Sequence, residues 1–285
     1  TSSDSAGNLG PAAGPSATFT VRSTPTAPVF QTGQSTCYDA AGSAIPCYGT
    51  GQDGALHPGL PWLSPRFADN GNGTMTDRTT GLTWSKDANV MSTRDPEFGG
   101  PGGVVTWNRA VAYVNKLNSE NHLGFNDWRL PTKEELAGLI DLDRTDSSAW
   151  LRGEGFSVDL ERNYWSSSSS WWKNCAIAVS LYDGSFPESA RISGQERVWP
   201  VRGAPQEIWP APRFTDNENG TITDNVTGLI WLQKANCFGT QSWSDALASA
   251  NNLASGSCGL SDGSSAGDWH LPTIREMQSI VNLDA

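Results

Sequence analysis

The chain has 285 residues, a length typical of two domains. Its formal net charge of −11 argues against nucleic acid, anionic membranes and sulfated glycans as partners, because like charges repel. No stretch approaches the roughly 18 consecutive apolar residues of a membrane helix. The 13 tryptophans favour a folded core over a disordered chain. The composition therefore predicts a folded protein with no membrane insertion and no nucleic-acid partner.

The first 64 residues read as a Ser/Gly/Pro-rich N-terminal arm. Within this arm, residues 17–22 alternate apolar and polar side chains as a β-strand does, with Phe19 and Val21 on one face. The sequence begins with Thr1 rather than Met, from which we expect that a leader has been removed. The arm is thus a candidate for strand pairing with another surface.

An internal repeat dominates the rest of the sequence. Residues 65–84 and 212–231 match at about 14 of 20 positions, and residues 127–143 return as 268–284. A repeat of this length with blocks in the same order indicates two tandem modules rather than short solenoid units. We therefore divide the chain into a complete module at 65–203, a linker at 204–211 and a partial second module at 212–285.

Each module is predicted to contain a β-meander and two helices. The Asn-Gly turns favour a hairpin, and a third strand follows at 82–84 and 229–231. Helical spacing predicts helices at 107–118, with Thr106 as N-cap, and at 243–254. Thr132 and Glu135 form a capping box that opens a second helix, and Thr273 and Glu276 repeat it. Strands are expected near 164–170, 177–181 and 198–201, so the fold class is α+β.

The five cysteines form two close pairs and a single residue. Cys37 and Cys47 close a short loop, and Cys237 and Cys258 close a Gly/Ser-rich one. Neither spacing fits a zinc or haem site, so we predict two disulfides and an oxidising compartment. Reduced buried thiols are the alternative. Cys175 lies in an alternating apolar run and is interpreted as a core thiol.

The hairpin turns also suggest calcium as a candidate cofactor. Hard oxygen ligands suit calcium, but Asn, Asp and Gly are equally the residues that hairpin turns require. Both interpretations stay open. The candidate ligands are Asp69, Asn72 and Asp77, with Asp216, Asn219 and Asp224 in the repeat.

Aromatic residues supply the best binding argument. Trp171 and Trp172 are consecutive, so on a strand one of them must point away from whatever the other packs against. With Tyr182 they are predicted to contact a ligand or partner, because exposed Trp and Tyr anchor such surfaces. The remaining repeat tryptophans are expected in the cores, namely Trp84, Trp128, Trp165, Trp231 and Trp269.

The ordered motifs DNGNGT, TDRTTGLTW, DWRLPT, YWSSS and VR resemble the Lcl C-terminal domain family, and they cover 65–203 and part of 212–285. That family resembles the C-type-lectin-like and formylglycine-generating-enzyme folds. The resemblance implies tandem C-type-lectin-like modules on a secreted or cell-surface protein used for attachment, without catalysis. An oxidase of the formylglycine-generating type would need a pair of reactive thiols, which Cys175 alone does not supply.

The second module stops 12 residues after Thr273 and has no counterpart of 164–202. We expect another segment to cover its apolar face, because open edges and exposed apolar surface are costly. The arm of another copy is the predicted partner, and such head-to-tail insertion propagates into a ring or filament. The leading hypothesis is a non-catalytic, self-associating structural or adhesive protein. A lectin-like binder of a glycan or other extracellular ligand, such as a surface protein, is the alternative.

Overall fold

The computed structural model describes residues 29–159, 163–170, 174–191, 193–203 and 212–281. The chain divides into two compact units. The central unit comprises Phe30–Gln34, Leu60–Pro205 and Gln278–Ala285, and the C-terminal unit comprises Thr1–Val29, Ser35–Gly59 and Gln206–Met277. The residues treated as one arm from the sequence are therefore shared: 35–59 cluster with the second module, and 60–64 with the first. Among the described residues, no helix has the length and apolar character needed to span a membrane.

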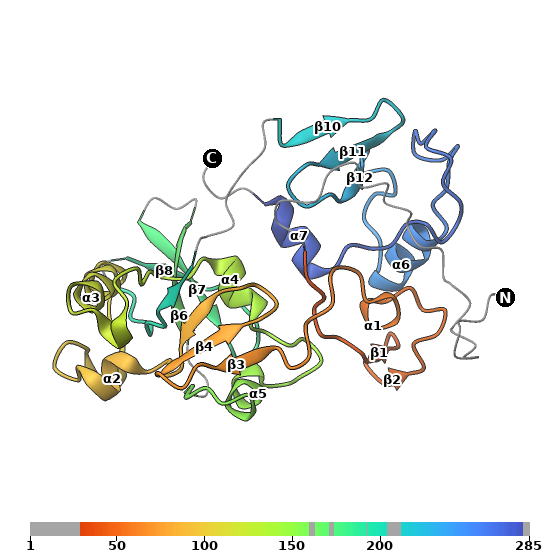
Figure 1. The fold of residues 1–285 in the computed structure, drawn as a ribbon. Helices are drawn as coiled ribbons and strands as arrows, with labels where there is room; N and C mark the ends of the chain where they lie inside the picture. Colours follow the sequence, from red (N-terminus) through yellow and green to blue (C-terminus); the bar gives the residue numbers. More distant parts are fainter. Residues whose placement is uncertain (1–28, 160–162, 171–173, 192, 204–211, 282–285) are drawn as a thin grey trace. The chain divides into compact units, whose positions relative to one another are not determined.

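The first sheet of the central unit is an antiparallel meander closed by a strand from the end of the module. Its order is β3-β4-β5-β9, and its first two strands, β3 and β4, are labelled in Figure 1. The strands are Phe67–Asp69, Thr74–Asp77, Thr83–Ser85 and Val201–Arg202. Trp84 of β5 pairs with Val201 of β9. The predicted meander and its closing strand are confirmed.

A second antiparallel sheet contains β6 (Asn163–Ser169), β7 (Cys175–Ser180) and β8 (Glu188–Ala190). The strand predicted near 177–181 is thus present as β7, which begins two residues earlier. Both faces of β7 are buried, because a hydrophobic cluster lies on each side of the sheet. Val179 packs into the cluster around Trp84, and Ala176 and Ala178 pack into the cluster around Trp165.

The two predicted helices of the first module are present. They are α3 (Trp107–Ser119) and α4 (Lys133–Gly138), and α4 begins with the expected capping box of Thr132 and Glu135. Thr106 occupies the N-cap position of α3 with extended backbone, as predicted, but its side chain makes no cap hydrogen bond. Two further helices, α2 (Val90–Arg94) and α5 (Ser147–Gly153), form within the expected loops.

The first module packs around large buried aromatic rings. The Trp84 ring lies 5.0 Å from that of Trp199, which is itself 5.6 Å from Tyr164, measured between ring centroids. Trp128 and Trp165 are buried in the other cluster. The core positions predicted for these three repeat tryptophans, Trp84, Trp128 and Trp165, are confirmed.

The C-terminal unit repeats the meander as β10 (Phe214–Asp216), β11 (Thr221–Asp224) and β12 (Ile230–Leu232). The sheet is drawn in cyan and blue in Figure 1. Helix α6 (Trp243–Asn251) follows, and α7 (Ile274–Ile280) belongs to this unit as far as Met277. Helix α6 is three residues shorter than predicted, because the chain turns after Asn252 into the loop closed by Cys258.

The N-terminal contribution to this unit is a short disulfide-closed hairpin. Strands β1 (Cys37–Tyr38) and β2 (Ala44–Ile45) pair, and helix α1 (Asp53–Leu56) follows them. The backbone at Gly51, which has φ +68°, approaches Asn251 so closely that a Cβ there would lie 1.8 Å from Nδ2. The chain at Gly51 is therefore packed against the end of α6.

Candidate functional site

The hairpin turns of the first module are held by their own side chains. The backbone N–H of Gly71 donates to Asp69 Oδ1 (2.9 Å), and that of Thr74 donates to Asn72 Oδ1 (3.1 Å). Asp77 Oδ1 accepts from a backbone N–H two residues later at 2.9 Å. A hydrogen bond from Lys86 lowers the pKa of Asp69 below its ordinary value. The turn-making interpretation of these three residues is confirmed.

The second module repeats these bonds at the equivalent positions. Asp216, Asn219 and Asp224 each accept from the backbone N–H two residues later, at 2.8, 3.1 and 2.9 Å. The strand register places Asp216 opposite Ile222 and Asp224 opposite Phe214, so the two carboxylates lie at opposite ends of the hairpin. No cluster of three His, Cys, Asp or Glu side chains suited to a metal occurs among the described residues. Calcium binding stays a prediction, which calcium titration by calorimetry would test.

Behind each hairpin lies a buried ion pair. Arg66 donates to Asp77 at 2.8 Å and also to the carbonyl of Gly138. The equivalent pair, Arg213 and Asp224, is separated by 3.2 Å. Because charges removed from water are stable only when paired, these residues fix the hairpins and are not free for catalysis.

The capping-box carboxylates are also paired in both modules. Arg129 forms a bidentate pair with Glu135 at 2.6 and 2.7 Å, whereas His270 Nε2 lies 3.1 Å from each carboxylate oxygen of Glu276. Burial raises the pKa of Glu276, but hydrogen bonds from His270 and Thr273 outweigh it and hold this pKa below its ordinary value. These carboxylates orient helices.

Both predicted disulfides form in the structure. Cys37 bonds to Cys47 and Cys237 bonds to Cys258. Disulfides form and persist in oxidising surroundings, so they indicate an oxidising compartment. Cys175, the one unpaired cysteine, lies at the start of β7 and is half-buried rather than enclosed in the core.

Most of the predicted contact residues cannot be placed. Phe19, Val21, Trp171 and Trp172 lie outside the described residues. Tyr182 is 46% exposed in the turn that follows β7. The described neighbours of the tryptophan pair, residues 170 and 174, lie at the opposite end of β7. The structure therefore does not place Tyr182 beside the strand end that leads to Trp171 and Trp172.

The turn beside Tyr182 carries a strongly acidic carboxyl group. Hydrogen bonds from Ser180 and Ser185 lower the pKa of Asp183 to about 2. The backbone N–H of Ser185 donates to Asp183 Oδ1 at 3.0 Å. The carboxylate thus fixes the turn and keeps a negative charge beside the exposed Tyr182 ring.

The two modules differ in the burial of equivalent apolar residues. Phe67 is 7% exposed and Leu136 is fully buried, whereas Phe214 and Met277 at the equivalent positions are 40% and 45% exposed. Ile222 and Trp231, which pair across β11 and β12, are only half-buried, unlike Met75 and Trp84.

The prediction that Trp231 and Trp269 are core residues is wrong, since both are only half-buried. We name Phe214, Ile222, Trp231 and Met277 the open face.

Strand β12, which carries Trp231 of the open face, has a neighbouring strand on one side only among the described residues. In the first module β5 pairs with β9, but within the described part of the chain β12 pairs only with β11. A strand edge of this kind presents unpaired N–H and C=O groups and can accept another strand. The open face and the β12 edge therefore form a surface suited to protein association.

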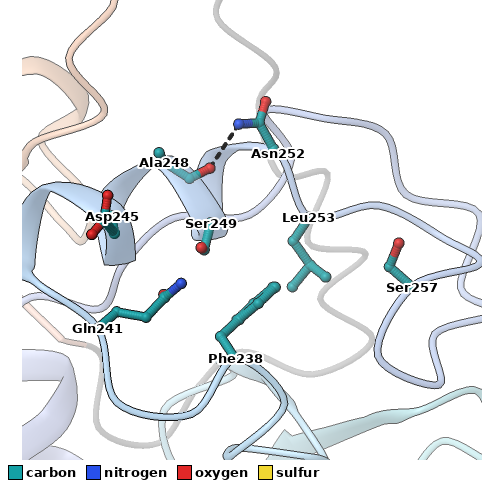
Figure 2. A pocket seen from close by; sticks show the side chains of 8 residues that line it. All are labelled: Phe238, Gln241, Asp245, Ala248, Ser249, Asn252, Leu253 and Ser257. Atoms are coloured by element: carbon teal, nitrogen blue, oxygen red, sulfur yellow. Dashed lines mark hydrogen bonds between the residues drawn. The ribbon is translucent and has the colours of Figure 1, made fainter.

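A separate pocket of about 400 Å³ lies beside α6, and Figure 2 shows the side chains that line it. Phe238 and Leu253 supply its apolar side, and Gln241, Asp245 and Ser249 supply polar groups. The Phe238 ring is exposed. An aromatic ring beside hydrogen-bonding side chains suits a ligand with both an apolar face and hydroxyl groups.

Sequence reasoning missed this pocket. The available signal was the disulfide, since Phe238 directly follows Cys237 and Ser257 directly precedes Cys258. The bond between the two cysteines brings these neighbours to the same place beside the helix. The predicted disulfide thus places two of the lining residues together, but it does not indicate the helix residues opposite them.

Comparison with known proteins adds one finding. The profile of a family described as the Lcl C-terminal domain matches residues 73–202 and 220–285. The two matched segments follow the two modules, and together they cover more than half of the sequence. A search of curated proteins gives no match.

Proposed function

The chain belongs to the Lcl C-terminal domain family, and on that premise we propose that it is a non-catalytic structural or adhesive protein that associates with copies of itself. It acts outside the cell, secreted or held at the surface, where its two disulfides persist. Its two modules are C-type-lectin-like variants of one fold. Family membership, the disulfides and the exposed surface of the second module support this proposal.

The open face is the observation that carries the proposal. Soluble monomers rarely expose contiguous apolar patches, and an exposed patch beside a bare strand edge is typical of a protein interface. Phe214 and Met277 are exposed at positions where the first module buries Phe67 and Leu136. The second module thus has apolar side chains at positions that are buried in the first module, and its own described residues do not bury them.

The chemistry of the described polar groups supports a role without catalysis. The carboxylates of the hairpins and capping boxes accept hydrogen bonds from the backbone or from paired cations. Four of the five cysteines are joined in disulfides, which leaves Cys175 without a second thiol for oxidase chemistry. Incubation with thiol-containing peptides and oxygen, followed by mass spectrometry, would detect an oxidase and contradict this part.

Light scattering and electron microscopy of the purified chain test self-association. We expect assemblies larger than one chain, and we expect Phe214→Ser combined with Met277→Ser to shift them toward monomers. Leu63→Ser is the matched control, because it removes an equally exposed apolar side chain from the central unit. A wild-type protein that stays monomeric at all concentrations tested contradicts the proposal.

The pocket of Figure 2 favours a second candidate function, the binding of an extracellular glycan. Phe238 would stack on a sugar face while Gln241 and Asp245 bond to hydroxyl groups. The test is a glycan array probed with wild type and Phe238→Ala. Binding that Phe238→Ala abolishes and Tyr48→Ala retains would support this function, since Tyr48 is an exposed aromatic residue absent from the pocket lining.

A further inference from the structure

One short motif that closes the first module occurs a second time near the start of the chain. The closing strand contains Trp199-Pro200-Val201-Arg202, and the arm contains Phe19-Thr20-Val21-Arg22. Both have an aromatic residue, one intervening residue, then Val and Arg. These are the only two Val-Arg pairs in the sequence. The arm therefore carries a second copy of the closing-strand pattern.

In the first module this pattern occupies the position between β5 and Arg129, which we call the slot. Val201 lies opposite Trp84 of β5, and on its other side its backbone exchanges hydrogen bonds with Arg129 at 2.9 and 3.1 Å. The preceding Trp199 ring packs on Trp84. The strand is thus held by backbone bonds on both sides and by a buried aromatic pair.

The final arginine of the pattern adds a charge contact. Arg202 lies opposite Thr83 and donates to both carboxylate oxygens of Asp127, at 2.8 and 3.1 Å. Asp127 belongs to the block that leads into the capping box. The pair therefore fixes the strand register relative to that block.

The second module has the same slot with no strand in it among the described residues. At the equivalent positions, Trp231 corresponds to Trp84, Asp268 corresponds to Asp127, and His270 corresponds to Arg129. Within the described residues β12 pairs only with β11, and His270 has no bridge to a strand. Asp268 Oδ2 accepts from the backbone N–H of Ser265 at 2.8 Å, and its other carboxylate oxygen has no hydrogen bond or ion pair within the described residues.

We propose that Phe19–Arg22 of a second copy adds to β12 as an antiparallel strand and closes this slot. The register follows the first module: Val21 lies opposite Trp231, Arg22 lies opposite Ile230, and the Phe19 ring packs on Trp231. The Arg22 guanidinium pairs with Asp268, as Arg202 pairs with Asp127. Strand addition supplies backbone hydrogen bonds, and the aromatic contact supplies apolar burial.

This inference rests on the proposed self-association and names its contact. The residues that follow the motif, 23–28, contain Pro25 and Pro28, and such segments extend rather than fold back. A spacer of six residues spans about 19 Å when extended. Because each copy has one arm and one slot, the contact is head-to-tail and builds a ring or a filament.

Register-specific crosslinking is the direct test. In a Cys175→Ser background, one chain carries Arg22→Cys and a second carries Ile230→Cys, and the two are mixed and oxidised. Residues opposite each other in antiparallel strands have Cα atoms about 4.5–5.5 Å apart, within disulfide range. We expect a reducible heterodimer. The matched control replaces Ile230→Cys with Leu232→Cys, two residues out of register, and is expected to crosslink at least tenfold less.

A charge exchange gives an independent readout. Arg22→Glu is expected to weaken association about tenfold or more, and Asp268→Arg in the same chain is expected to restore it. Rescue by the exchanged pair would not occur if Arg22→Glu merely unfolded the arm. Failure of the exchange to rescue, together with crosslinking that ignores register, overturns the proposal.

Three further outcomes separate this inference from the function on which it rests. If deletion of residues 1–28 leaves assembly size unchanged, the arm contact is wrong while self-association stands. If a chain with both cysteines closes on itself as a monomer at dilution, insertion occurs within one copy and the second-copy assignment is wrong. If the wild type never assembles, the proposed function itself fails.

Discussion

The two modules share their local structure and differ in their burial. Each has the same side-chain bonds in its hairpin turn, the same buried Arg–Asp pair and the same capping box. Yet the first surrounds its meander with apolar side chains, while equivalent residues of the second are exposed. Short-range bonds thus form without a finished core, and burial of the meander requires strands from elsewhere.

Reduction of the disulfides should produce the largest difference between the units. Both disulfides lie in the C-terminal unit. Loop-closure entropy assigns about 3 kcal/mol to each bond, slightly more to the Cys237–Cys258 loop because it is longer. We expect a reductant to raise hydrogen exchange in peptides from 212–277 and to leave those from 65–159 unchanged. Equal loss of protection in both would break the comparison.

Truncation of the equivalent residues Leu136 and Met277 should produce the next largest difference in stability between the two modules. Leu136→Ala is expected to cost about 2–5 kcal/mol of unfolding free energy, because it leaves a cavity in a closed core. Met277→Ala should cost under about 1 kcal/mol, since its side chain is 45% exposed. Urea denaturation of the two variants measures both values. A similar cost for Met277→Ala in a monomeric sample would show that the open face is already covered.

Removal of one partner of the buried ion pair tests whether the shared polar structure is equally important. Asp77→Asn leaves Arg66 buried without its counter-ion and should cost at least about 3 kcal/mol. Asp224→Asn should cost less, because Arg213 is more exposed and its pair is longer. Urea unfolding monitored by circular dichroism measures the two costs. A larger cost for Asp224→Asn would reverse the expected order.

Acid should produce the smallest difference in stability between the two units, and the direction of the effect follows from the pKa of Glu276. The folded pKa of this carboxyl lies below its ordinary value of 4.5. Its contribution to stability is therefore present above pH 4.5 and is lost as the pH falls through the folded pKa. We expect the melting temperature of the C-terminal unit to fall across this window, and Glu276→Gln to flatten that dependence. An unchanged slope in Glu276→Gln would assign the effect to another group.

Sequence reasoning was most successful where a structure depends on residues close in the chain. The turns at Asp69 and Asp216, the capping box at Thr132 and the disulfide of Cys237 were all predicted correctly. In each case the interacting groups lie within a few residues or in one closed loop. Thr106 shows the limit even there, because its backbone has the N-cap conformation while its hydroxyl makes no cap bond.

By itself, the sequence determined the repeat, the local elements and the two disulfides, because these follow from spacing and from side chains that bond to nearby backbone. Only the tertiary structure decided that β7 is buried on both faces, that Trp231 is half-buried and that Phe238 lines a pocket. Those outcomes depend on which distant segments pack together. Two meanders of similar sequence therefore differ in burial, because the burial of a strand depends on the segments that pack around it and not on its residues alone.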